Sequence, residues 1–193
     1  MRKIDKIYEN IFDNYYIDLS EYLNHYLHKI YIKPNHLTLL SLITGIFSAY
    51  LIYTNHFFKA LCLFQCSYLL DCMDGSMART YKQETTFGDY FDHISDIIKL
   101  SILLFTILIN TKIVQFEKIL FFIICSILFI LLVIHFGCQE KFYNTKLNKN
   151  SLYYCMFLCK KKDYINLTKY FGSGTFINFI SLFLLYKTIS TPR

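Results

Sequence analysis

The sequence predicts an all-α fold: a polytopic membrane bundle of five to six transmembrane helices, preceded by an amphipathic N-terminal helix. Its 193 residues are 54% hydrophobic and only 18% charged, with a mean hydropathy of +0.34. A chain of this length is too short for several soluble domains, and this composition is too apolar for an ordinary one. Several apolar runs also reach the ~20 residues that a helix needs to cross a bilayer. We therefore expect a single membrane domain over residues 1–193.

Residues 1–33 predict the amphipathic helix. Apolar and aromatic side chains from Ile4 to Tyr26 recur between charged ones at roughly helical spacing, a pattern typical of helices that lie in the membrane interface. A small soluble helical cap would show the same pattern, and both interpretations fit. No apolar segment of a cleavable signal follows the basic residues at the start of the chain, so we expect insertion to depend on an internal span.

Five apolar stretches are expected to cross the membrane. Four belong to residues 34–137, the central part of the domain, and the fifth belongs to residues 138–193. A sixth span would have to come from residues 141–164, where the apolar stretch is too short to cross before three consecutive lysines. The five stretches cover residues 36–54, 57–78, 87–111, 117–137 and 174–189.

The placement of lysine and arginine predicts how these spans are oriented. Fourteen such residues lie in residues 1–35, 79–86 and 138–173, whereas the alternate connections hold only three. Short loops rich in Lys and Arg stay in the cytoplasm during insertion. We therefore expect a cytoplasmic N-terminus, a cytoplasmic connection between the second and third spans, and a cytoplasmic loop after the fourth. Contact of these residues with anionic lipid headgroups explains the net charge of +6, and we expect no nucleic-acid partner.

Aspartates flank the connection between the second and third spans. The second span ends with Asp71-Cys-Met-Asp74-Gly75-Ser-Met-Ala78-Arg79, and after eight further residues comes Gly88-Asp-Tyr-Phe-Asp92-His-Ile-Ser-Asp96. At about 100° per residue, the aspartates, small residues and arginine of the first segment share an arc of roughly 140° on one helix face. The aspartates of the second segment follow its glycine at steps of four residues. Antiparallel packing would then bring four aspartates together at the cytoplasmic membrane edge.

Four carboxylates at this depth must face a wet cavity, be protonated or bind cations. A single aspartate at the membrane centre costs about 2.5 to 3.5 kcal/mol, so four would cost about 10 to 14 kcal/mol without compensation. Clustered carboxylates are typical ligands of hard cations such as Mg²⁺ or Mn²⁺. Acidic residues at a solvated helix end would need no ion, but such an end has no need of small residues on the same faces. Gly75, Ala78 and Gly88 would let a diphosphate approach the backbone.

The pattern D-x-x-D-G-x-x-A-R, eight residues, then G-x-x-x-D-x-x-x-D resembles the signature of the CDP-alcohol phosphotransferases at all eight fixed positions. The segment Pro34-Asn35-His-Leu-Thr38-Leu, with Gly45 following, resembles the family's entry into its first span. The resemblance implies a fold of six transmembrane helices, a homodimer and a polar cavity open to the cytoplasm. It also implies a reaction that passes a substituted phosphate from a CDP-linked donor to an alcohol and releases CMP.

The resemblance also implies roles for the signature residues. Asp71, Asp74 and Asp92 would hold the metal, with two Mg²⁺ or Mn²⁺ ions clamping the donor diphosphate. Asp96 would take the proton from the attacking hydroxyl. The remaining positions would bind the CDP donor: Gly75, Ala78, Arg79 and Gly88.

The signature does not specify the substrates. The short chain favours transfer of a phosphatidyl group from CDP-diacylglycerol, whereas Phe91-Asp92-His93 resembles the aminoalcohol branch, which uses CDP-choline or CDP-ethanolamine and diacylglycerol. Two other classes also place aspartates in membrane helices. One is an intramembrane prenyltransferase. The spacing of Gly75, Ala78, Arg79 and Gly88 argues against this class. The other is a nonenzymatic membrane transporter whose aspartates form an ion path.

Other features have simpler interpretations. Ser41, Gly45 and Ala49 recur at steps of four residues and predict close helix packing. His93 neighbours Asp92, but adjacent helix positions point apart, which argues against a direct role. Residues 135–141 and 169–175 are distinctive, yet they predict no function.

Overall fold

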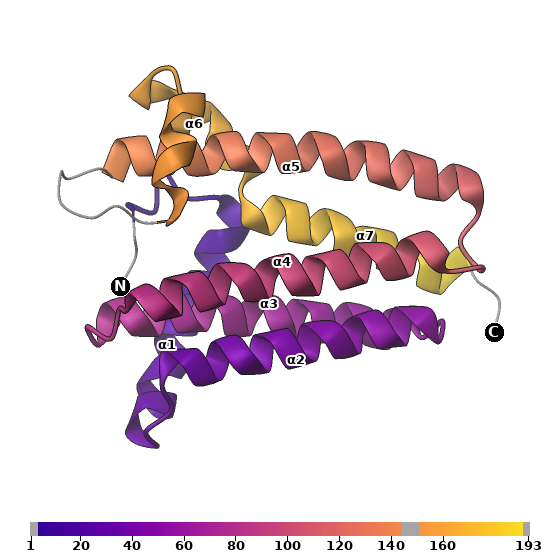
Figure 1. Cartoon of the computed structure of the whole chain (residues 1–193), viewed down its shortest axis with the longest axis horizontal. Coiled ribbons are helices and arrows are strands. Elements are labelled where there is room, and N and C mark those ends of the chain that lie inside the picture. Colours follow the sequence, from indigo (N-terminus) through magenta and orange to yellow (C-terminus); the bar gives the residue numbers. More distant parts are fainter. Residues whose placement is uncertain (1–3, 144–150, 191–193) are drawn as a thin grey trace.

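The structure, a computed structural model, describes residues 4–143 and 151–190. These residues form helices and turns without any strand, so the all-α prediction is confirmed (Figure 1). The long helices are α1 Ile11–Lys29, α2 Pro34–Tyr53, α3 Phe57–Thr80, α4 Thr86–Ile109, α5 Gln115–Tyr143 and α7 Ser173–Ser190.

Helices α2 to α5 and α7 run up and down along the long axis of the molecule (Figure 1). Helix α2 packs against both α3 and α4, and α7 packs against α3 and α5. The main apolar core joins all five helices through residues such as Ile52, Phe64, Leu103, Phe121 and Ile180. Each helix agrees to within several residues with one of the five predicted stretches, because length and hydropathy are local properties of the sequence.

Among the described residues, two helices are long and apolar enough to cross a membrane by length and composition, Pro34–Tyr53 and Gln115–Phe142. The helices α3 and α4 have 24 residues each, but they carry the two aspartate segments. Helix α7 has 18 residues. The structure therefore supports five long helices in the expected places, and it identifies two of them as candidate spans.

No sixth long helix lies between α5 and α7 in the described residues, while residues 144–150 lie outside them. The chain there forms only short helices, and a disulfide between Cys138 and Cys159 ties it to α5. None of these helices is long enough to cross a bilayer. They are Ser151–Leu158, Lys162–Tyr164, α6 Ile165–Thr168 and Lys169–Phe171.

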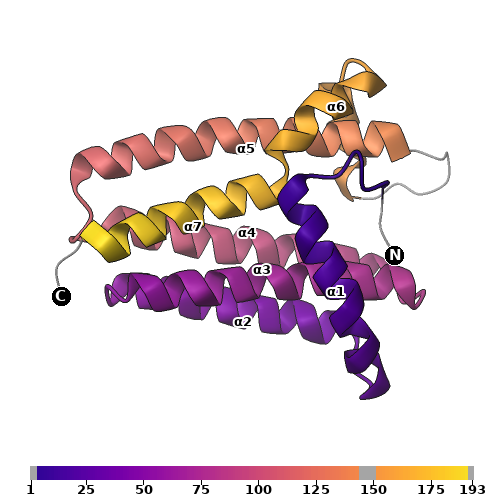
Figure 2. The ribbon, with the colours of Figure 1, turned by 180° about the vertical axis from the view of Figure 1, so that it is seen from behind.

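Helix α1 crosses the bundle at a steep angle (Figure 2). The ring of Tyr16 meets that of Tyr68 on α3 edge-to-face, with 4.9 Å between centroids. The side-chain amide of Asn24 donates to the carbonyl of Met73, 2.9 Å away. The helix within residues 1–33 is thus confirmed over Ile11–Lys29. Its apolar side chains that face outward are Ile11, Phe12, Tyr15, Tyr22 and Tyr26.

The distinctive residues 135–141 meet the start of α1. His135 is fully buried, with Nδ1 3.2 Å from Thr168 Oγ1 and Nε2 3.0 Å from Gln139 Nε2. The same amide nitrogen of Gln139 donates to Glu9 Oε1 at 2.9 Å. Because buried polar groups need hydrogen-bond partners, this network fixes the C-terminal part of α5 against the chain just before α1.

Residues 169–175, which lead into α7, contact the start of α1. The side-chain amide of Asn10, which caps α1, donates to the Lys169 carbonyl at 2.7 Å and to Thr175 Oγ1 at 2.9 Å. A Cβ atom added at Gly174 would lie 2.5 Å from Asp13 Oδ1. The glycine therefore permits a backbone approach that any side chain would block.

Candidate active site

A short turn joins the two aspartate segments. Helix α3 ends at Thr80 and α4 begins at Thr86. Between them the chain turns through Lys82, which has φ of 54° in the left-handed region. Thr85 caps α4, because its hydroxyl accepts a hydrogen bond from the backbone N–H of Gly88 at 3.0 Å. Both segments consequently start from the same end of the bundle.

Asp74 on α3 faces α2 and is buried, with 4% of its surface exposed. It accepts a hydrogen bond of 2.5 Å from Thr38 Oγ1 on α2. A buried carboxylate without such a donor would be costly. Thr38 belongs to the segment that begins at Pro34, the first residue of α2, so the start of α2 holds one of the predicted metal ligands in place.

Lys99 joins the two aspartate segments. Its ammonium lies 2.6 Å from Asp71 Oδ1 on α3 and 2.7 Å from Asp96 Oδ1 on α4. It also donates to Ser41 Oγ on α2 at 2.8 Å. Sequence reasoning missed this residue. A signal was present, because Lys99 lies within a predicted span and follows Asp96 by three positions, on the same helix face.

The predicted small-residue stripe on α2 does pack against its neighbours. Ser41 Oγ donates to the carbonyl of Ser67 on α3 at 2.9 Å, and Ala49 is buried. A Cβ atom at Gly45 would lie 3.0 Å from Lys99 Cβ and 3.1 Å from Ser67 Oγ. The packing prediction is confirmed, and the stripe has a second effect, because Gly45 leaves room for the side chain of Lys99.

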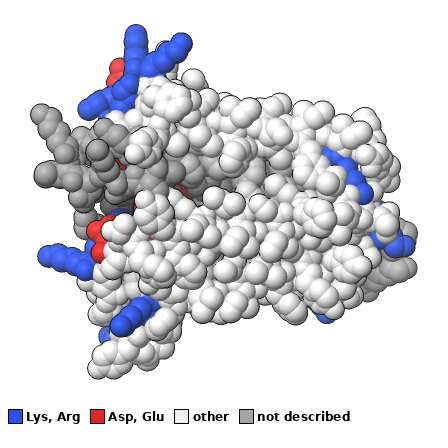
Figure 3. All heavy atoms as spheres, viewed as in Figure 1, with Lys and Arg blue, Asp and Glu red and all other residues white. Residues whose placement is uncertain are grey.

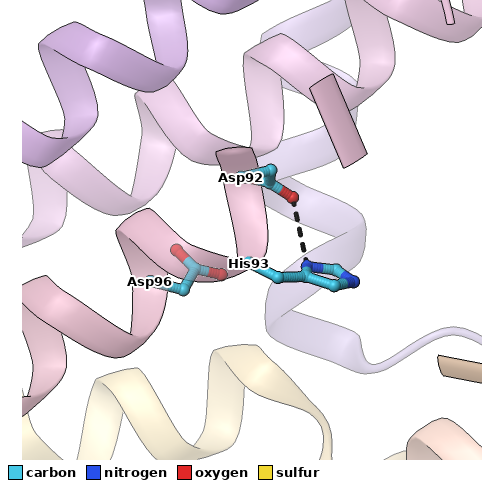
Figure 4. A group of neighbouring side chains, drawn as sticks. All are labelled: Asp92, His93 and Asp96. Atoms are coloured by element: carbon cyan, nitrogen blue, oxygen red, sulfur yellow. Dashed lines mark ion pairs between the residues drawn. The ribbon is translucent and has the colours of Figure 1, made fainter. Parts of the chain in front are cut away.

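Asp92, His93 and Asp96 form a group on α4 in which one ligand atom of each lies within 4.8 Å of the others (Figure 4). His93 Nδ1 is 3.6 Å from Asp92 Oδ2, and Nε2 is 3.9 Å from Asp89 Oδ1. Although adjacent helix positions point apart, the imidazole ring turns back towards the carboxylate of Asp92, and the argument against a direct role of His93 stays a prediction.

The four predicted aspartates lie close enough to interact. Electrostatic interactions join Asp74 to Asp92 and Asp71, and join Asp96 to Asp71 and Asp92. Carboxylate oxygens in this number are the ligands that Mg²⁺ and Mn²⁺ prefer. The donor set of the site thus fits a hard divalent cation.

The other signature residues surround the two segments. A Cβ atom at Gly75 would lie 3.2 Å from Arg79 Nη1, so the guanidinium lies against the glycine. Ala78 is half-buried one turn further on. A Cβ atom at Gly88 would lie 3.0 Å from Thr85 Oγ1 and 3.2 Å from Asn35 Oδ1. Gly88 therefore has a packing role at the start of α4, in addition to the donor contact that the resemblance implies.

Comparison with known families agrees with this geometry. A model of the CDP-alcohol phosphatidyltransferases matches residues 31–186, which include all eight signature positions. No curated protein and no solved structure matches the chain. The match extends over most of the sequence and covers the helices that hold the aspartates together, so the chain belongs to the CDP-alcohol phosphatidyltransferase family.

Proposed function

We propose that this protein is an integral membrane CDP-alcohol phosphotransferase that transfers a phosphatidyl group from CDP-diacylglycerol to an alcohol and releases CMP. The single observation that supports this most is that the two aspartate segments lie together, with Asp71 on α3 and Asp96 on α4 both in contact with Lys99. Arg79 lies beside Gly75 at the same end of α3. Family membership supports a role of this class. The resemblance to the family also leads us to propose a homodimer.

Each residue of the site has a proposed part in the reaction. Asp71, Asp74 and Asp92 would hold divalent metal, which when bound neutralises the donor diphosphate and favours in-line displacement. Arg79 binds the diphosphate as a fixed cation. Asp96 takes the proton of the acceptor hydroxyl on the oxygen that does not contact Lys99. Thr38 keeps Asp74 turned towards the site.

The surface supports insertion into a membrane. On the face shown in Figure 3, Lys, Arg, Asp and Glu gather towards the two ends, and the middle is almost free of them. Many of the exposed side chains of the long helices are large and apolar, and soluble monomers rarely expose large contiguous apolar patches. The exposed side chains include Ile43, Phe47 and Tyr50 on α2, Ile97, Phe105 and Leu108 on α4, and Ile119, Ile123 and Ile130 on α5.

The test is release of CMP by the purified protein. We expect CMP from CDP-diacylglycerol with one of a panel of alcohols, inositol, inositol phosphate, glycerol phosphate and serine. Release should stop on chelation and return with Mg²⁺ or Mn²⁺.

Asp96→Asn should keep donor binding while turnover falls by about 10² to 10⁴-fold, the usual contribution of a general base. Asp74→Asn should lose metal-dependent donor binding.

Other donors separate the remaining possibilities. Release of CMP only from CDP-choline or CDP-ethanolamine, with diacylglycerol as acceptor, would move the protein to the aminoalcohol branch. Consumption of a prenyl diphosphate without CMP release from any donor would indicate a prenyltransferase. Full CMP release in metal-free buffer would rule out the metal-dependent mechanism.

A further inference from the structure

Lys99 is held from three helices at once. Its ammonium contacts Asp71 on α3, Asp96 on α4 and Ser41 on α2 at 2.6 to 2.8 Å. The contacts with Asp71 and Ser41 are hydrogen bonds, and the contact with Asp96 is an ion pair. The side chain is 11% exposed, and Gly45 provides the space beside it. Lys99 is consequently a fixed positive charge within the carboxylate cluster.

A metal ion cannot occupy the same place. Mg²⁺ binds oxygen at about 2.0 to 2.1 Å, and the ammonium is already 2.6 Å from Asp71 Oδ1. An ion on that oxygen would lie within a few ångströms of the ammonium, where two positive charges in a poorly solvated site repel strongly. Among the described residues, Lys99 forms ion pairs with Asp71 and Asp96 and none with Asp74 or Asp92, although its charge also acts on these two carboxylates. An ion on Asp74 and Asp92 would therefore not have to displace the ammonium from an oxygen that it contacts.

We propose that Lys99 takes the place of one divalent cation, so that the site holds a single ion through Asp74 and Asp92, and Asp71 pairs with Lys99 in place of the metal role proposed for it above. This differs from the two ions that the family resemblance implies, and it rests on the proposed function only in assuming that the aspartates bind metal. Asp71 and Asp96 are then neutralised in part by a charge that belongs to the chain itself.

Titration of the purified full-length protein with Mn²⁺ alone tests this inference. We expect the wild type to saturate at one ion per chain. Lys99→Met and Lys99→Gln, which remove the charge, should saturate at two. Lys99→Arg, which keeps it, should saturate at one. Lys99→Gln keeps a polar contact to Ser41 and supplies the result if Lys99→Met does not fold.

Lys187→Met is the matched control. Lys187 is also a buried lysine in an ion pair, 2.9 Å from Glu117 Oε2, but it lies near the end of α7, at the opposite end of the bundle (Figure 1). This variant should bind one ion like the wild type. A gain of an ion in Lys187→Met would show that loss of a buried lysine acts through stability and not through the site.

Two results would overturn the inference: a wild type that binds two ions or none, or neutral Lys99 variants that bind as many as the wild type. A CMP-release assay on the same wild-type sample separates this from the proposed function. If CMP is released but the Mn²⁺ counts are equal, only the inference fails. If the counts are one and two but no donor yields CMP, the inference holds and the proposed function fails.

Discussion

A single hydroxyl on α2 positions a carboxylate of the site. Thr38 is 3% exposed and donates to Asp74 at 2.5 Å. It lies in the first turns of α2, which begins at Pro34. Hydrogen bonds to a charged acceptor are stronger than those between neutral groups. Such a bond also orients the carboxylate of Asp74, so that the lone pairs not used by the Thr38 hydroxyl face the site.

Replacing Thr38 with valine should therefore weaken metal binding. Thr38→Val keeps the shape of the side chain and removes the donor to Asp74, and loss of such an orienting partner typically lowers metal affinity about 10 to 100-fold. The measurement is a Mn²⁺ titration of the purified variant. Thr44→Val is the control, because in the described part of the chain the Thr44 hydroxyl bonds to the carbonyls of Leu40 and Ser41 on its own helix. Equal affinities in the two variants would contradict the role of Thr38.

At the scale of the elements, α1 is attached by a buried acid. Asp13 accepts a hydrogen bond from the Tyr68 hydroxyl on α3. It lies against Gly172, just before α7, and Gly174, the second residue of α7. Burial raises the pKa of Asp13 from 3.8 to about 7, although the Tyr68 bond opposes this shift. The folded protein therefore takes up a proton here that the unfolded chain, at the same pH, has released.

This shift predicts how stability depends on pH. Because the folded pKa is raised, the contribution of Asp13 is fully present below pH 3.8 and is lost as the pH rises to about 7. Asp13→Asn resembles the protonated acid, so it should flatten this part of the profile. Its melting temperature at pH 8 should exceed that of the wild type, by a difference that shrinks towards pH 4.

Melting curves in detergent between pH 4 and pH 8 measure this effect. Asp18→Asn is the control on the same helix, because Asp18 is exposed and pairs with Lys6. It should leave the pH dependence unchanged. If Asp13→Asn and the wild type lose stability in parallel from pH 4 to pH 8, Asp13 is not the group responsible.

At the scale of the whole molecule, the three segments rich in Lys and Arg lie at one end of the bundle. The connection before α2, the α3–α4 turn and the described residues after α5 all gather there, whereas the α2–α3 and α4–α5 connections lie at the other end (Figure 1). The structure thus agrees with the alternation predicted from the charges. The preference of such loops for the cytoplasm predicts which side of the membrane this end faces.

Cysteine labelling tests this orientation. With a membrane-impermeant maleimide on intact cells, Glu84→Cys in the α3–α4 turn should label only after permeabilisation. Thr111→Cys in the α4–α5 connection should label without it. The unmodified chain reports the labelling of the native cysteines and is subtracted from both. The reverse pattern would place the aspartates on the other side of the membrane.

Local sequence patterns predicted much of this molecule. The five stretches and the two aspartate faces depend on hydropathy and helical period, which neighbouring residues determine. The contacts of Lys99 with Asp71 and Ser41, and of Thr38 with Asp74, could not be predicted in the same way, because they depend on how α2, α3 and α4 pack together. The disulfide joins Cys138 to Cys159, two of seven cysteines whose spacing shows no pairing pattern. The network from Glu9 to Gln139 joins residues 130 positions apart.

That last kind of contact affects how the chain matures during synthesis. Asn10 bonds to Thr175, 165 positions later in the sequence, and ribosomes add about 5 to 20 residues per second. The N-terminal segment therefore waits roughly 8 to 33 s for its partner to be made. Throughout that interval α2 to α5 can already be inserted, while α1 has no binding surface on α7. The contacts of α1 with α3, such as that of Tyr16 with Tyr68, can form earlier, so it is the cap of α1 at Asn10 that waits for α7.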